Sequence, residues 1–186
     1  MRTGKHFSEF IATFALTFVG GGAIIATSGE NILVIALAHG LILAVMASAM
    51  MQVSGSQFNP AVSIALATRG KQSWSQAMSF SIVQIFGGIA AAFLLKATMV
   101  PAYSFANTHI GETLGIYSGS AGPEMISTWR VLVLEGLAAF FLMWIIMAVA
   151  VDPKNKQHAG IAGLAIGGVV AADILCFGPL TGASMN

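Results

Sequence analysis

Five apolar stretches, each about as long as a membrane-spanning helix, constrain the fold of this chain more than any other feature. A helix needs about 20 consecutive apolar residues to cross the hydrocarbon core of a bilayer. Charged residues make up only 8% of the chain, against roughly 25% in a soluble domain. The sequence therefore predicts an all-α integral membrane protein, with spans at about 7–28, 32–52, 74–95, 129–151 and 159–178.

Bulk composition argues against several other classes of protein. The net charge of +1 gives no basic surface that would indicate nucleic acid as a partner. A single cysteine, Cys176, excludes an internal disulfide. The first apolar stretch is too long for the core of a cleavable signal and has Glu9 early in it, so it is better interpreted as a first span.

One motif occurs twice among these spans. Residues 54–59 read SGSQFN and residues 181–186 read TGASMN, so the two hexads agree in residue type at every position. The first copy continues with Pro-Ala, while the sequence as given stops at the second Asn. A short apolar piece at about 59–68 follows the first copy; it is too short to span and is typical of a re-entrant half-helix.

Charge placement predicts the orientation of the spans. Six of the eight Lys and Arg residues fall on one side when the chain is threaded through five spans, and cytoplasmic loops carry such an excess. We therefore expect a cytoplasmic N-terminus and an external loop at about 96–128. The first hexad then enters the membrane from the cytoplasm and the second from outside. The six residues are Arg2, Lys5, Arg69, Lys71, Lys154 and Lys156.

The two halves also match outside the hexads. Residues 9–14 and 135–140 both read E-x-x-A-x-F, and three spans separate these two starts, so the halves have opposite orientations. Inverted repeats of this kind place a solute path near the bilayer midplane, between the halves. The sequence predicts one membrane channel domain over 1–186, with repeat 1 at about 1–95 and an incomplete repeat 2 at about 129–186.

These features resemble those of the major intrinsic proteins, the aquaporins and glycerol facilitators. The resemblance covers essentially the whole chain and rests on NPA at 59–61, the two span-embedded glutamates, QIFGG at 84–88 and GPLTGASMN at 178–186. The ending GASMN looks closest to nodulin-like intrinsic proteins and their bacterial relatives. The resemblance implies an aquaporin-like right-handed bundle, and a homotetramer with one pore in each subunit.

In such a bundle, Asn59-Pro60-Ala61 and Asn186 would lie where two half-helices meet in mid-membrane. A helix N-terminus carries roughly +0.5 charge, which repels cations, including hydronium. Each Asn carboxamide donates to a permeant oxygen, and Pro60 starts its half-helix without wasting a backbone donor. The plainer interpretation of Asn59 is the N-cap of a surface helix.

Glu9 and Glu135 are ionisable groups inside apolar spans. A charged residue at the centre of a span costs about 2.5–3.5 kcal/mol on insertion scales, so each needs partners within the bundle. One interpretation is a proton relay; the other, which the resemblance favours, is that each carboxylate accepts hydrogen bonds from the backbone of the re-entrant loop beside it. Asp173 is a third carboxyl in a span, and it either lines the external vestibule or pairs within the bundle.

The resemblance also locates a selectivity constriction on the external side. Counting from the motifs gives His39, Ile174 and Ala183 for three of its four positions, and the fourth would follow the second Asn. This set departs from both the water-selective and the glycerol-selective pattern of the family. We expect a broadened filter that passes water and small neutral solutes such as glycerol, urea or metalloid hydroxides. The alternative for His39 is a buried packing residue.

The leading hypothesis is therefore passive conduction across the bilayer, with protons and ions excluded. We expect no enzymatic step, cofactor, metal site or nucleic-acid partner, and a location in the plasma (inner) membrane. Two alternatives stay open. A secondary transporter also uses inverted repeats and broken helices. The second alternative is that the 186-residue chain is a non-conducting fragment, because the resemblance implies a second half-helix and a sixth span beyond Asn186. Without them we expect poor folding and no selective flux.

Overall fold

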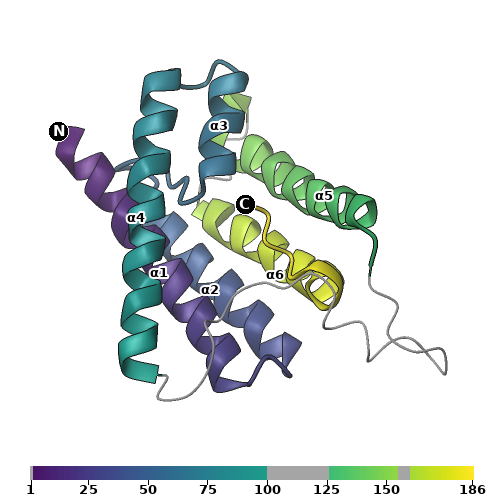
Figure 1. The fold of residues 1–186 in the computed structure, drawn as a ribbon. Coiled ribbons are helices and arrows are strands. Elements are labelled where there is room, and N and C mark those ends of the chain that lie inside the picture. Colours follow the sequence, from purple (N-terminus) through teal and green to yellow (C-terminus); the bar gives the residue numbers. More distant parts are fainter. Residues whose placement is uncertain (1, 100–125, 155–159) are drawn as a thin grey trace.

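The computed structural model describes residues 2–99, 126–154 and 160–186, and in these ranges the chain forms a bundle of helices (Figure 1). The helices are α1 (Arg2–Ala26), α2 (Ile32–Met50), α3 (Pro60–Thr68), α4 (Trp74–Met99), α5 (Thr128–Ile146) with its π-helical continuation η2 (Met147–Val151), and α6 (Ala162–Thr181).

Five helices in the described ranges are long and apolar enough to cross a membrane, which confirms the five predicted spans. Their bounds differ modestly from the predicted ones, since α1 already begins at Arg2 and α4 continues to Met99. Lys96 lies in the last turn of α4, where the helix dipole stabilises a cation and a long side chain can reach the membrane surface. Most of the predicted external loop, residues 100–125, lies outside the described residues.

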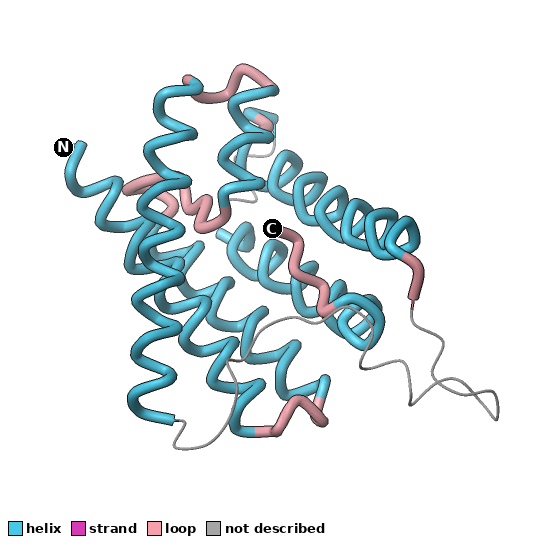
Figure 2. The backbone as a smooth tube through the Cα atoms, viewed as in Figure 1, coloured by secondary structure: helices cyan, strands magenta, loops and turns pink. Residues whose placement is uncertain are grey.

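The short apolar piece after the first hexad forms helix α3, which is nine residues long. A helix of this length rises only about 14 Å, roughly half the thickness of the hydrocarbon core. Figure 2 shows that the chain reaches α3 through a non-helical segment that runs back into the middle of the bundle, and a second such segment follows α6. The predicted half-helix is therefore present in the fold.

Helices α2 and α6 approach each other closely because small residues line both. A Cβ added at Gly40 would lie 2.8 Å from the Ala171 Cβ, and one added at Gly167 would meet the Gly40 carbonyl oxygen. Gly163 likewise lies against Ala44 of α2. Close approach through small residues is typical of membrane bundles, in which van der Waals packing replaces the hydrophobic driving force. This pair joins the first predicted repeat to the second.

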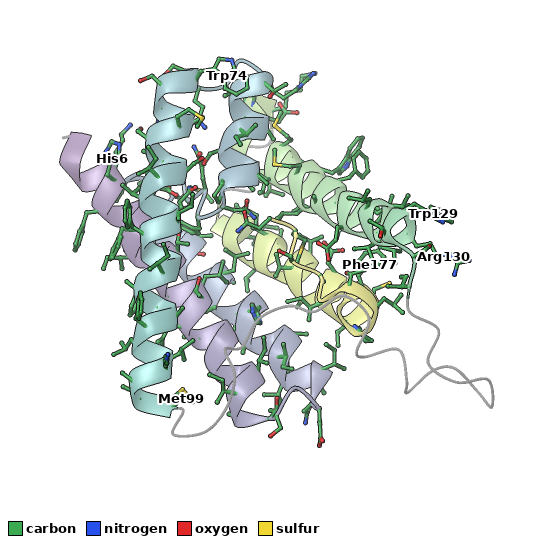
Figure 3. All side chains as sticks on the ribbon, viewed as in Figure 1. His6, Trp74, Met99, Trp129, Arg130 and Phe177 are labelled. Atoms are coloured by element: carbon green, nitrogen blue, oxygen red, sulfur yellow. The ribbon has the colours of Figure 1, made fainter. Side chains whose placement is uncertain are left out.

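Helix α1 also packs closely along α4 because a glycine lies at the contact. Gly87 of α4 lies against the main chain of Phe10 and Phe14, where any side chain would collide with the α1 backbone. Nearer the N-terminus, the His6 and Phe80 rings meet edge to face, with 5.3 Å between their centroids. The His6 side chain is labelled in Figure 3. These contacts fix α1 and α4 as one unit, against which the first hexad folds.

The outer faces of the described helices are apolar, whereas several polar side chains lie inside. Glu9, Ser63 and Gln84 are at most 1% exposed. Trp74 and Trp129 mark the starts of α4 and α5 (Figure 3) and are more than half exposed, as expected of tryptophan at a membrane–water interface. This distribution suits a lipid environment. Among the most exposed apolar residues are Phe93, Leu132 and Leu164.

Candidate functional site

Two non-helical segments approach each other in the middle of the bundle (Figures 1 and 2). The first loop comprises residues 51–59, before α3, and the second loop comprises residues 182–186, after α6. Both have left-handed φ angles at matched positions, which cost an ordinary L-residue roughly 1–2 kcal/mol. The angles are 95°, 56° and 54° at Gly55, Ser56 and Phe58, and 87°, 48° and 54° at Gly182, Ala183 and Met185.

One glutamate holds the backbone of each loop. The Glu9 carboxylate accepts hydrogen bonds from the backbone N–H groups of Gln57 at 3.1 Å and Phe58 at 2.7 Å. The Glu135 carboxylate accepts from the matched N–H groups of residues 184–185 at 3.1 and 2.9 Å. Hydrogen bonds to a charged acceptor are shorter and about twice as strong as neutral ones. These bonds give each loop a fixed backbone despite its strained φ angles.

The first residue of each hexad makes the same hydrogen bond in both loops. The Ser54 hydroxyl oxygen accepts from the backbone N–H of Ser56 at 3.2 Å, and the Thr181 hydroxyl oxygen accepts from that of Ala183 at 3.1 Å. Thr181 also donates its own proton to Glu135 at 2.6 Å. This hydrogen bond closes a turn, which explains why each hexad begins with a small hydroxyl residue.

Asn59 connects the two loops. Its side-chain oxygen caps α3 by accepting from the backbone N–H groups of Ala61 at 2.7 Å and Val62 at 3.3 Å. Its amide nitrogen donates to the Met185 carbonyl oxygen in the second loop at 2.9 Å. Pro60 follows at the first helical position, where its fixed φ suits the helix and no N–H is needed. The Asn59 side chain therefore joins residues that lie 126 positions apart.

A cavity of about 670 Å³ lies beside this junction. It is bordered by both loops and by side chains of α1, α2, α3, α5 and α6. Of the candidate residues, His39, Asn59, Ile174, Ala183 and Asn186 line it. Pro60, Ala61, Glu9 and Glu135 are not among the lining residues. The structure thus brings the three constriction candidates and both motif asparagines around one space.

The wall of the cavity is mostly apolar. Polar side chains come chiefly from the loops and from His39, which is half-buried. Asn59 has two amide hydrogens, and within the described residues one of them bonds Met185 while the other has no partner. A largely apolar wall with a few oriented donors is typical of sites that take small molecules. The apolar lining includes Leu16, Ile35, Leu43, Val62, Leu142, Ile146, Ile166 and Val170.

Sequence reasoning did not assign Gln84 a structural role. Its side-chain nitrogen donates to Glu9 at 2.8 Å and to the Ser63 hydroxyl at 3.1 Å, so it links α4 to both α1 and α3. Sequence reasoning also missed the contribution of α1 to the cavity. The spacing of Thr17, Gly21 and Ile24 on one helical face was the available signal, since residues three and four apart share a face.

Asp173 does not border the cavity. It is 4% exposed, and its Oδ2 atom has no hydrogen-bond partner within the described ranges. The sequence left open whether this carboxyl lines the vestibule or pairs in the bundle, and the described residues show neither. In the same ranges, no group of three His, Cys, Asp or Glu side chains could hold a metal ion.

Comparison with known proteins identifies the family. Residues 2–186 match the family model described as major intrinsic protein. The chain belongs to the major intrinsic protein family. It is 34% identical to Aquaporin NIP1-2 of Oryza sativa subsp. japonica over 183 residues, which are 96% of this chain and 57% of that protein. It is 36% identical to Aquaporin NIP3-1 of Arabidopsis thaliana over 186 residues, which are 98% of this chain and 55% of that protein.

Solved structures of this family show the same fold. The aquaglyceroporin from Plasmodium falciparum matches with a TM-score of 0.79 at 21% identity, covering 98% of this chain and 75% of that chain. The predicted aquaporin-like bundle is therefore confirmed, and so is the placement beside nodulin-like intrinsic proteins. This major intrinsic protein sequence spans a little over half the length of these two curated relatives.

Proposed function

We propose that this protein is a passive channel for water and small uncharged solutes, which excludes protons and ions and performs no enzymatic step. The observation that carries the proposal is the junction of the two loops at Asn59 and Met185, at the edge of a cavity that both loops border. In this proposal, residues 1–186 form one channel domain. A solute path between inverted halves is the arrangement expected for such a fold.

Selectivity against cations arises at Asn59 in this proposal. The N-terminal end of α3 lies at this residue, and the unpaired N–H groups of a helix start carry a positive partial charge. The remaining Asn59 amide hydrogen donates to the oxygen of a permeant molecule, and Asn186 supplies the matching donor from the second loop. A water molecule held by two donors cannot readily pass a proton onward, so both field and geometry oppose proton transfer.

The range of solutes is set by His39, Ile174 and Ala183. All three line the cavity, and Ile174 and Ala183 are apolar and of modest size. We infer a filter that admits neutral molecules larger than water, such as glycerol, urea and undissociated metalloid hydroxides. Glu9 and Glu135 support the loops and do not relay protons, in keeping with their contacts to loop backbone and their place outside the lining.

We also infer the setting in which the channel acts. In this proposal the N-terminus is cytoplasmic, which the excess of Lys and Arg on that side of the five spans supports, and the protein lies in the plasma membrane. The apolar outer faces of the helices contact lipid and neighbouring subunits of a homotetramer. Native mass spectrometry from detergent micelles checks the tetramer, and a mass of one subunit in every detergent tested would contradict it.

The test is transport through purified protein in liposomes. Stopped-flow light scattering measures the osmotic permeability to water and then the permeability to glycerol, urea and arsenous acid. An internal pH dye under an imposed potential measures proton leakage. We expect flux of water and of at least one larger neutral solute, without proton flux. Water flux with every larger solute excluded would overturn the broadened filter, and gradient-dependent saturable flux would favour a transporter.

A further inference from the structure

The imidazole of His39 is held in a defined position by α2 itself. Its Nδ1 atom lies 2.8 Å from the Ile35 carbonyl oxygen, one helical turn earlier. A carbonyl oxygen can only accept, so Nδ1 carries the proton and donates it. This bond fixes the plane of the ring and leaves Nε2 on the opposite edge.

That opposite edge rests against Gly20 of α1. Gly20 is buried, and α1 residues on either side of it along the chain, Thr17 and Gly21, line the same cavity as His39. A Cβ placed on Gly20 would overlap the ring, with Nε2 nearest and Cε1 at 2.6 Å. Real Cβ atoms essentially never approach a heavy atom within 3.0 Å. The ring can therefore occupy its place only because residue 20 has no side chain.

We propose that Gly20 is a positioning residue for the selectivity constriction, because it lets the His39 ring lie back against α1 and so keeps the path wide. This inference rests on the proposed channel function and deepens it. A methyl group at position 20 breaks the bond from Nδ1 to the Ile35 carbonyl and moves the ring away from α1. The cavity is the open space beside the ring, so the displaced ring narrows it. The upper size limit for permeant solutes is thus set jointly by His39 and by the absence of a side chain on α1.

Gly22 does not share this property, which provides a matched control. A Cβ on Gly22, two residues along the same helix, would make ordinary contact with the Met99 sulfur at 3.4 Å. Gly22→Ala therefore carries the same change in helix propensity and adds the same methyl group to α1, without touching the ring. A difference between Gly20→Ala and Gly22→Ala cannot come from helix propensity.

The test compares solute selectivity in the full-length protein in liposomes. We expect Gly20→Ala to lower the ratio of glycerol to water permeability by about tenfold, as one methylene can in a tight pocket. Gly22→Ala leaves the ratio unchanged. Adding His39→Ala to Gly20→Ala restores glycerol flux, because the displaced ring is gone. An unchanged ratio in Gly20→Ala, or a double variant as restricted as Gly20→Ala, would overturn the inference.

A second readout does not depend on conduction. Nuclear magnetic resonance of protein with ¹⁵N-labelled histidine reports the protonation of each ring nitrogen, and the His39→Gln variant identifies the His39 signal among the four histidines. We expect a protonated, hydrogen-bonded Nδ1 in the wild type and in Gly22→Ala, and a shifted signal in Gly20→Ala. An identical signal in all three contradicts the positioning role. Shifted signals in a protein that passes no solute would leave positioning intact and contradict the channel function.

Discussion

The two loops have nearly the same sequence and backbone, yet their surroundings differ. In the first loop, Glu9 is fully buried and accepts a third hydrogen bond, from Gln84 of α4. In the second loop, Glu135 is partly exposed, and its third donor is Thr181, a residue of the hexad itself. The same bends therefore form whether the third donor to the glutamate comes from a separate helix or from the hexad itself.

This difference distinguishes the contacts that set the backbone conformation of a loop from the contacts that bury its glutamate. The hexad and one glutamate suffice for the left-handed φ angles at the second, third and fifth hexad positions, because these are the parts that the two loops share in the described residues. Gln84 and Ser63 add a buried network around Glu9 alone. A buried polar network is stable only if its members are satisfied, so the first loop is the more sensitive of the two.

The largest effect is expected from the glutamates. Glu9→Gln places an amide donor against backbone donors in a site without water, and we expect the free energy of unfolding to fall by about 3 kcal/mol or more. Glu135→Gln lowers the free energy of unfolding by about 1–2 kcal/mol, because Glu135 is partly exposed and water can replace some of the hydrogen bonds that are lost. Unfolding by SDS in mixed micelles measures both, with the exposed Glu30→Gln as control. Equal losses at the two glutamates would contradict the distinction.

The next effect concerns the bond that joins the loops. Asn59→Asp keeps an oxygen for the cap of α3 but replaces the amide donor that faces the Met185 carbonyl. We expect a loss of about 1–3 kcal/mol, together with a marked fall in water permeability. Asn31→Asp is the matched control, since Asn31 caps α2 through Val34 at an exposed site. Normal flux through Asn59→Asp would show that the junction is not needed for conduction.

A smaller effect tests whether Gln84 accounts for the difference between the loops. Gln84→Ala removes one donor to Glu9, and we expect a loss of about 1–2 kcal/mol. In the Gln84→Ala background, Glu9→Gln should cost about 1 kcal/mol less than in the wild type, because contacting residues couple in a double-mutant cycle. Gln52→Ala, at an exposed site, is the control. Strict additivity of the two changes would contradict the network.

The smallest effect concerns backbone strain. Ala183 has a φ of 48°, and glycine adopts that conformation without penalty, so Ala183→Gly should raise the free energy of unfolding by up to about 1 kcal/mol. The matched Ser56→Gly should change little, because it also removes the bond from the Ser56 hydroxyl to the Ala47 carbonyl at 2.9 Å. Thermal unfolding in detergent checks both. A larger gain at Ser56 than at Ala183 would contradict this assignment.

The sequence predicted much of the fold because membrane spans can be recognised from the apolar composition and the length of a stretch. A continuous apolar run has few other stable forms in lipid, so the five spans and the half-helix followed from residue type alone. The pairing of the halves followed from the repeated hexads and glutamates. Helix ends were less predictable, as at Arg2 and Met99, because a helix continues through polar residues at the membrane surface.

The details of the site were less accessible. The left-handed angles at Phe58 and Met185 contradict the ordinary preference of bulky residues, so only the surrounding hydrogen bonds account for them. The hydrogen bond from Asn59 joins distant parts of the chain through the backbone carbonyl of Met185. Because every residue has a backbone carbonyl, the sequence does not indicate which one accepts. Gly20 belongs to a run of three glycines at residues 20–22, and the His39 ring beside it is what distinguishes it from Gly22.

The most direct test of the central claim is chemical block of the cavity. With Cys176→Ser as background, since Cys176 is the single native cysteine, new cysteines are placed at Ile174, which lines the cavity, or at Leu164, which is exposed on the outer face. A small neutral thiol reagent is applied to protein in liposomes, and water permeability is measured with modification checked by mass spectrometry. We predict that modification of Ile174→Cys abolishes most of the water flux, while Leu164→Cys is unaffected. Full flux through modified Ile174→Cys would contradict a path through this cavity.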